Sequence, residues 1–195
     1  WYQRIYVASA SGGSARRVDI NLARANAPVW SPDGKYLLFA GSAEPSGFGL
    51  RPTRDWWTVP VEGGEAVPLG ARDLFLQRDI QQRFISPHQW VADGNYVLFH
   101  AASGGGASNL WRVQISDDGR RLIGEPQRLT SGTGEQDPSA TQDGRIAFVN
   151  AIQDWDIWKL PIDANAAGVR GEPERVISGL SRDVIPSIPA DARTL

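Results

Sequence analysis

WSPDGKYLLF, at residues 30–39, is the clearest copy of an internal repeat. The pattern returns as WVADGNYVLF at residues 90–99, as ATQDGRIAF at 140–148 and, in degenerate form, as PADAR at 189–193. The aspartates of the four copies are 60, 50 and 48 residues apart, at Asp33, Asp93, Asp143 and Asp191. Self-similarity at such a period indicates a repeat architecture in which each copy is one supersecondary unit.

Each copy joins a tight turn to a short apolar strand. Pro32 fixes its own φ and Gly34 permits the left-handed backbone that closes the turn, so the Asp-Gly pair marks a hairpin. The residues after the turn, 36–39 in the first copy, form a continuous apolar run. Such a run is expected of a strand that neighbouring sheets cover on both faces.

Two further motifs follow the turns in a fixed order. The first centres on an aromatic residue and reads RIYV at 4–7, DWWTVPV at 55–61, NLWRVQI at 109–115 and DIWKLPI at 156–162. The second begins with glycine and reads GSARRV at 13–18, GEAVPL at 64–69, GEPQRL at 124–129 and GEPERV at 171–176. Together with the strands on either side of the Asp-Gly turn, these motifs predict units of four strands.

The predicted fold class is all-β, a β-propeller built of four-stranded antiparallel blades. Residues 1–195 then form one partial propeller with about four blade equivalents. These are the last two strands of a blade at 1–20, whole blades at about 25–70, 84–130 and 136–178, and the start of another at 184–195. We expect a piece of a larger ring; the alternative is that the terminal halves join and close a small propeller.

Composition narrows the classes of partner and chemistry. A net charge of −2 gives no reason to expect nucleic acid, which needs a basic face. No apolar run approaches the roughly 20 residues of a membrane-spanning helix, so we expect no membrane contact by this piece. The chain has no cysteine and lacks the Gly-x-Ser-x-Gly, Gly-x-x-x-x-Gly-Lys and His-Glu-x-x-His motifs. We therefore expect no catalytic residues, no metal and no cofactor.

The two histidines of the chain, His88 and His100, fall on neighbouring predicted strands. They can converge on a weak metal or general-base site, but the sequence offers no complete ligand set, and we interpret them as packed, hydrogen-bonded side chains. Three tryptophans share one position of the repeat, which predicts core packing rather than a ligand cage. They are Trp57, Trp111 and Trp158.

Two long insertions, at residues 42–54 and 71–83, flank the first whole blade. Antiparallel strand order places both at the same end of the sheets. We predict a surface there for an acidic ligand or a protein partner, at the propeller face or channel mouth, formed by Phe48, Arg51, Arg54, Trp56, Arg72, Arg78, Arg83 and His88. The alternative is a set of plain surface loops whose arginines are balanced by Asp55, Asp73 and Asp79.

The repeat resembles that of the TolB-like (WD-repeat-like) β-propeller family, on the motif WSPDGKYLLFA followed by a strand of the DWWTVPV type. This resemblance covers nearly the whole chain. The resemblance implies a six- or seven-bladed ring and a periplasmic or other extracytoplasmic location. NLWRVQI, with PQRLT at residues 126–130, is most similar to the sensor halves of membrane-linked bacterial regulators and kinases.

The resemblance therefore implies a non-catalytic sensory or protein-interaction module of a larger bacterial protein. The alternative is the substrate-gating propeller of a prolyl-oligopeptidase-like or tricorn-like serine peptidase whose catalytic domain lies outside this chain.

Overall fold

The computed structural model describes residues 2–44, 54–81, 85–93, 95–103, 107–151, 157–163 and 168–177. The chain divides into two compact units, Trp1–Asn150 and Ala151–Leu195. Strands make up most of the regular structure in these ranges, and the one described helix has seven residues. No helix among the described residues has the length and apolar character needed to cross a membrane. The prediction of an all-β fold is confirmed.

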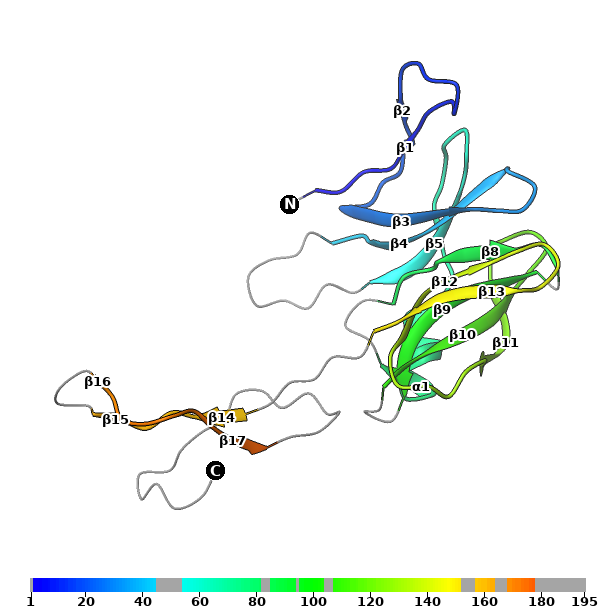
Figure 1. Ribbon diagram of the computed structural model, residues 1–195. Helices are drawn as coiled ribbons and strands as arrows, with labels where there is room; N and C mark the ends of the chain where they lie inside the picture. The colour runs from blue at the N-terminus through cyan, green and yellow to red at the C-terminus, as the bar shows by residue number, and fades with distance from the viewer. Residues whose placement is uncertain are drawn as a thin grey trace. The chain divides into compact units, whose positions relative to one another are not determined.

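The first sheet corresponds to the predicted blade at residues 25–70 (Figure 1). Its four antiparallel strands follow chain order: β3 (Arg24–Trp30), β4 (Tyr36–Ser42), β5 (Asp55–Pro60) and β6 (Val67–Pro68). Asp33 organises the turn between β3 and β4, because its Oδ1 accepts bonds from the Ser31 hydroxyl (2.7 Å) and the Lys35 amide (3.0 Å). Gly34 has a φ of 71°, the left-handed value expected at this position.

The second sheet contains the predicted blade at residues 84–130 and one additional strand. Its strands are β7 (Ile80–Gln81), β8 (Gln89–Val91), β9 (Tyr96–Ser103), β10 (Ser108–Ile115) and β11 (Leu122–Arg128). Strands β8 to β11 follow chain order, and β7 pairs with the far end of β9. The indole N–H of Trp57 in the first sheet and that of Trp111 in the second donate to equivalent carbonyls, those of Gly41 (3.3 Å) and Ala101 (3.0 Å).

A helix occupies part of the insertion at 71–83, where we expected only a loop. α1 (Ala71–Gln77) begins after Gly70, whose φ is 69°. Its Phe75 packs edge-on against Trp56, with ring centroids 5.2 Å apart, and stacks on Phe99 at 4.8 Å. A helix this short is marginal by itself, so burial of Phe75 and Ala71 is what stabilises it.

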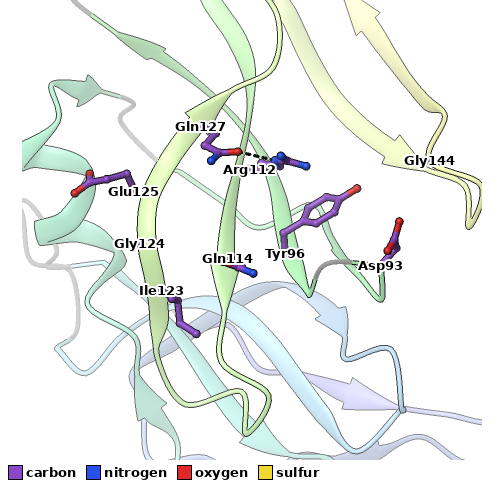
Figure 2. A pocket seen from close by; sticks show the side chains of 9 residues that line it. All are labelled: Asp93, Tyr96, Arg112, Gln114, Ile123, Gly124, Glu125, Gln127 and Gly144. Carbon is purple, nitrogen blue, oxygen red and sulfur yellow. Dashed lines mark hydrogen bonds between the residues drawn. The ribbon is translucent and has the colours of Figure 1, made fainter.

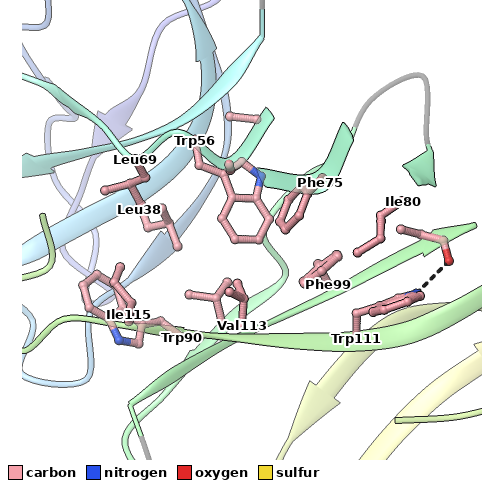
Figure 3. Close-up of a cluster of buried hydrophobic side chains, with 14 residues drawn as sticks. Leu38, Trp56, Leu69, Phe75, Ile80, Trp90, Phe99, Trp111, Val113 and Ile115 are labelled. Atoms are coloured by element: carbon pink, nitrogen blue, oxygen red, sulfur yellow. Dashed lines mark hydrogen bonds between the residues drawn. The ribbon is translucent and has the colours of Figure 1, made fainter. Parts of the chain in front are cut away.

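The main core lies between the first and second sheets (Figure 3). Its largest buried members are Trp56, Phe75, Trp90, Phe99 and Trp111. A second core covers the opposite face of the first sheet and includes Ile5, Val18, Ile20, Leu22, Leu37, Phe39 and Val59. Strand β4 is therefore covered on both faces, as its continuous apolar run predicted.

Two hairpins complete the first unit. β1 (Tyr6–Val7) pairs with β2 (Arg16–Arg17) inside the segment 1–20, where we predicted the last two strands of a blade. β12 (Glu135–Ala140) pairs with β13 (Ile146–Asn150), and β12 contacts β8, β9 and β10. Because β8 also contacts β3, the first strands of three successive repeats adjoin one another in the order β3, β8, β12.

The described residues of the second unit form two short antiparallel pairs. β14 (Ile157–Lys159) pairs with β17 (Glu174–Ile177), and β15 (Ile162–Asp163) pairs with β16 (Gly168–Val169). Within the segment 136–178, predicted as one four-stranded blade, the described strands pair two by two inside each unit. Apolar side chains in its described part are exposed, and Trp158, predicted in a core, is 56% exposed. The predicted start of a further blade at 184–195 lies outside the described residues.

Candidate functional site

Two of the arginines predicted for a binding surface, Arg54 and Arg72, lie together at a depression at the end of the first sheet. Arg54 and Arg72 line this depression of about 210 Å³ together with Trp57 and the carboxylates of Asp55 and Asp73. Burial, and then the nearby charge of Arg24, lower the pKa of Arg54 from its ordinary value. Arg54 and Arg72 thus line the same depression as Trp57.

Asp55 holds the depression in shape through its hydrogen bonds to the backbone. Its Oδ1 accepts from the amides of Trp56 (2.7 Å) and Arg72 (3.2 Å), and its Oδ2 accepts from the amide of Gly70 (3.0 Å). These bonds connect β5 to the start of α1. The guanidinium of Arg72 donates to Asp73 at 2.9 Å, so this arginine is already partly neutralised.

The other residues predicted for this surface lie elsewhere. Trp56 is 1% exposed and belongs to the main core, with its indole N–H bonded to the Ile85 carbonyl (3.0 Å), so its place on an exposed surface is not supported. Alternation along β5 explains this, because neighbouring residues point to opposite faces of a sheet. Arg78 forms a double hydrogen bond with Glu125 of β11. Phe48, Arg51 and Arg83 lie outside the described residues.

His88 belongs to a different cluster, which includes His100 of β9 and Asp137 of β12. One ligand atom from each of the three side chains lies within 4.8 Å of those of the other two. The Nε2 atom of His88 is 3.2 Å from Asp137 Oδ1, and His100 Nδ1 is 3.8 Å from the same oxygen. The two imidazole rings have centroids 4.6 Å apart. The structure thus brings the histidines together, with a carboxylate that the sequence reasoning missed.

Backbone structure positions each member of this cluster. The amide of His88 donates to the Leu98 carbonyl (2.9 Å), which fixes His88 beside β9. Asp137 lies at a register shift in β12, between Gln136 and Ser139, with a φ of 50° that is uncommon for a residue other than glycine. Ala27 has the same φ at the equivalent shift in β3, so two of the repeats share this bulge.

The hydrogen bonds of the two rings identify their protonation. His88 Nδ1 lies 3.0 Å from the Ser86 carbonyl and must donate to it, since a carbonyl oxygen only accepts. His100 Nδ1 accepts from the Asp137 amide (3.1 Å), so it carries no proton in this arrangement. Burial, and then repulsion from His88, lower the pKa of His100, while Asp137 opposes the shift. His100 is therefore a neutral ring at pH 7.

A larger groove, which the sequence did not indicate, lies on the second sheet (Figure 2). It has a volume of about 490 Å³ and is lined by Tyr96, Arg112, Gln114, Ile123 and Gln127, among others. Arg112 lies over the Tyr96 ring at 5.3 Å and donates to Gln127 at 3.0 Å. The alternation of exposed Arg112 and Gln114 with buried neighbours along β10 is the sequence signal that marks this face.

Comparisons with known proteins leave the family open, since no protein-family model and no curated protein matches the chain.

Proposed function

We propose that this chain is part of a β-propeller and serves as a non-catalytic binding module. The observation that carries the proposal is the series β3, β8 and β12, in which the first strands of three successive repeats adjoin one another. Sheets that repeat in this way, each packed face to face with the next, are the building plan of a propeller. The resemblance to the TolB-like family supports the same proposal.

The binding surface that we propose is the depression formed by Arg54 and Arg72. Guanidinium groups recognise carboxylates through paired hydrogen bonds, and the neighbouring Trp57 offers an apolar surface beside them. The ligand class is an acidic peptide segment of a partner protein. By resemblance, the module belongs to the sensory half of a larger, extracytoplasmic bacterial protein. The alternative function is the substrate-gating propeller of a serine peptidase, which is supported by resemblance alone.

Titration with a glutamate-rich peptide tests this surface. We expect saturable binding that weakens with added salt, because exposed charges are screened. The double variant Arg54→Ala/Arg72→Ala should bind at least about tenfold more weakly, since hydrogen bonds to charged groups contribute roughly 1.5–3 kcal/mol. Calorimetry, or the fluorescence of Trp57 and its neighbours, measures the change.

Arg121→Ala is the matched control, because Arg121 is an exposed arginine in the turn between β10 and β11, away from the depression. It should leave peptide binding unchanged. Equal weakening by the control and the double variant, or the absence of any binding to the peptide, would contradict the proposed surface.

A further inference from the structure

We propose that His88, His100 and Asp137 bind a divalent transition-metal ion of the Zn²⁺ type. This site shares no residue with the arginine depression, so it stands or falls independently of the proposed function. Two imidazoles and one carboxylate form a donor set that suits zinc and its neighbours in the first transition row.

The first argument is an unmatched pair of acceptors. The His88 ring gives its Nδ1 proton to the Ser86 carbonyl, so its Nε2 carries a lone pair whenever the ring is neutral. This lone pair faces Asp137 Oδ1 at 3.2 Å, and an ionised carboxylate is also only an acceptor. Two acceptors at this distance need either a proton or a metal ion between them.

The second argument is the spacing of the donors. Zinc binds histidine nitrogen and carboxylate oxygen at about 2.0–2.2 Å, so neighbouring ligand atoms of a tetrahedral site are roughly 3.3–3.5 Å apart. The distance from His88 Nε2 to Asp137 Oδ1, 3.2 Å, is slightly shorter than this range, and the distance from His100 Nδ1 to the same oxygen, 3.8 Å, is slightly longer. For all three donors to reach one ion, the exposed Asp137 side chain must rotate and the Asp137 amide must release its hydrogen bond to His100 Nδ1 (3.1 Å), because that nitrogen has a single lone pair.

The third argument is the surroundings of the ligands. Metal-binding histidines usually donate their second ring nitrogen to a carbonyl or carboxylate, and the Ser86 carbonyl serves His88 in this way. The His88 and His100 side chains are 19% and 16% exposed, whereas that of Asp137 is 65% exposed. The ion would therefore reach the site from the Asp137 side, where water completes its coordination.

The repeat supplies an internal comparison. His88 and His100 lie five residues before and seven residues after Asp93, and Asp137 lies six residues before Asp143. The equivalent positions around the preceding junction, counted from Asp33 and Asp93, are occupied by Pro28, Ala40 and Pro87. None of these residues can bind a metal, and the first two sheets pack against each other without one. The packing of one sheet on the next therefore does not require His88, His100 and Asp137.

The test uses the whole chain, freed of metal with a chelator and titrated with Zn²⁺. We expect one ion per chain by calorimetry and weaker binding below pH 6, because protons compete for the histidine nitrogens. Each of the variants His88→Gln, His100→Gln and Asp137→Asn should weaken Zn²⁺ binding at least about tenfold. Asp93→Asn, an exposed carboxylate outside the cluster, should leave it unchanged.

The ring signals of the histidines provide a second readout that does not depend on variants. Because the chain has only two histidines, the NMR signals of His88 and His100 are easily assigned, and both should shift together when one equivalent of Zn²⁺ is added. Binding that survives all three substitutions, or ring signals that do not move, would overturn the proposal. The cluster would then be an ion pair between protonated His88 and Asp137.

Discussion

Strands β4 and β13 occupy the same position of the repeat but have opposite environments. Leu38 and Phe39 of β4 are each 0% exposed, whereas the residues at the same register positions of β13, Ala147 and Phe148, are exposed, Phe148 at 45%. Both strands follow an Asp-Gly turn and pair with the strand before it. The repeat therefore determines where a strand forms, while burial depends on whether a further sheet covers it.

The largest effect should come from truncating one side chain at matched positions of the two strands. Phe39→Ala removes a fully buried ring from the second core and should lower the free energy of unfolding by about 3–5 kcal/mol. Phe148→Ala removes a half-exposed ring and should cost less than about 1 kcal/mol. Urea unfolding followed by tryptophan fluorescence measures both. Similar losses for the two variants would mean that β13 is covered in solution.

The next effect concerns the strands of the Trp motif, where Thr58 and Arg112 are equivalent. Thr58 is buried, and its hydroxyl donates to the Gly119 carbonyl of the second sheet at 2.8 Å. Thr58→Ala leaves that carbonyl without its partner and should cost about 1–3 kcal/mol. Arg112→Ala lies on the exposed groove and should change stability by no more than about 0.5 kcal/mol.

Both variants are compared by thermal and urea unfolding. A serine at position 58 keeps the hydroxyl, and it should recover most of the stability that Thr58→Ala loses. A loss for Arg112→Ala as large as that for Thr58→Ala would show that the groove on the second sheet is covered.

The smallest effect concerns the turns, which should behave alike in the covered and uncovered regions. The Ser31 hydroxyl bond, followed by the Lys35 amide bond, lowers the pKa of Asp33 from 3.8 to about 2, and the Thr141 hydroxyl likewise lowers the pKa of Asp143. A depressed folded-state pKa stabilises the fold above the unfolded pKa of about 3.9, and this contribution is lost as the pH falls through about 2.

Ser31→Ala and Thr141→Ala should therefore each raise the pKa of the aspartate two residues later. Carboxyl NMR titration of the two variants and the parent measures these shifts. If only Ser31→Ala changes its aspartate, the turns depend on burial after all, and the comparison between β4 and β13 extends to them.

Local patterns in the sequence were sufficient to predict the strands and turns of the first two sheets, except the short strand β7. The Asp-Gly turns, the apolar runs after them and the hydrogen bonds of Trp57 and Trp111 all follow from residues that are close together in the chain. Helix α1 was missed because its seven residues are too few to show a helical period. Its stability depends on Phe75 reaching Trp56 and Phe99, which are distant in sequence.

The candidate sites were harder to predict, because they depend on which sheets meet. The histidines were recognised as neighbours, but Asp137 is 37 residues beyond His100 and joins them only when β12 packs against β9. Trp56 was assigned to the surface but lies in the core. The sequence does not distinguish Trp56 from its neighbour Trp57, because either tryptophan suits a buried strand. Aligning the repeats position by position would have identified this carboxylate, because Asp137 stands where the first repeat has Ala27.

The bulge shared by β3 and β12 also makes this position suitable for engineering. Ala27 adopts the same backbone conformation as Asp137 without any polar side chain, so the shape of the strand does not depend on the carboxylate. New side chains can therefore be grafted at this position of the first and third repeats, whereas the second repeat has Pro87 there. A protein built in this way acquires or loses a ligand by single substitutions, which makes its binding chemistry evolvable separately from its fold.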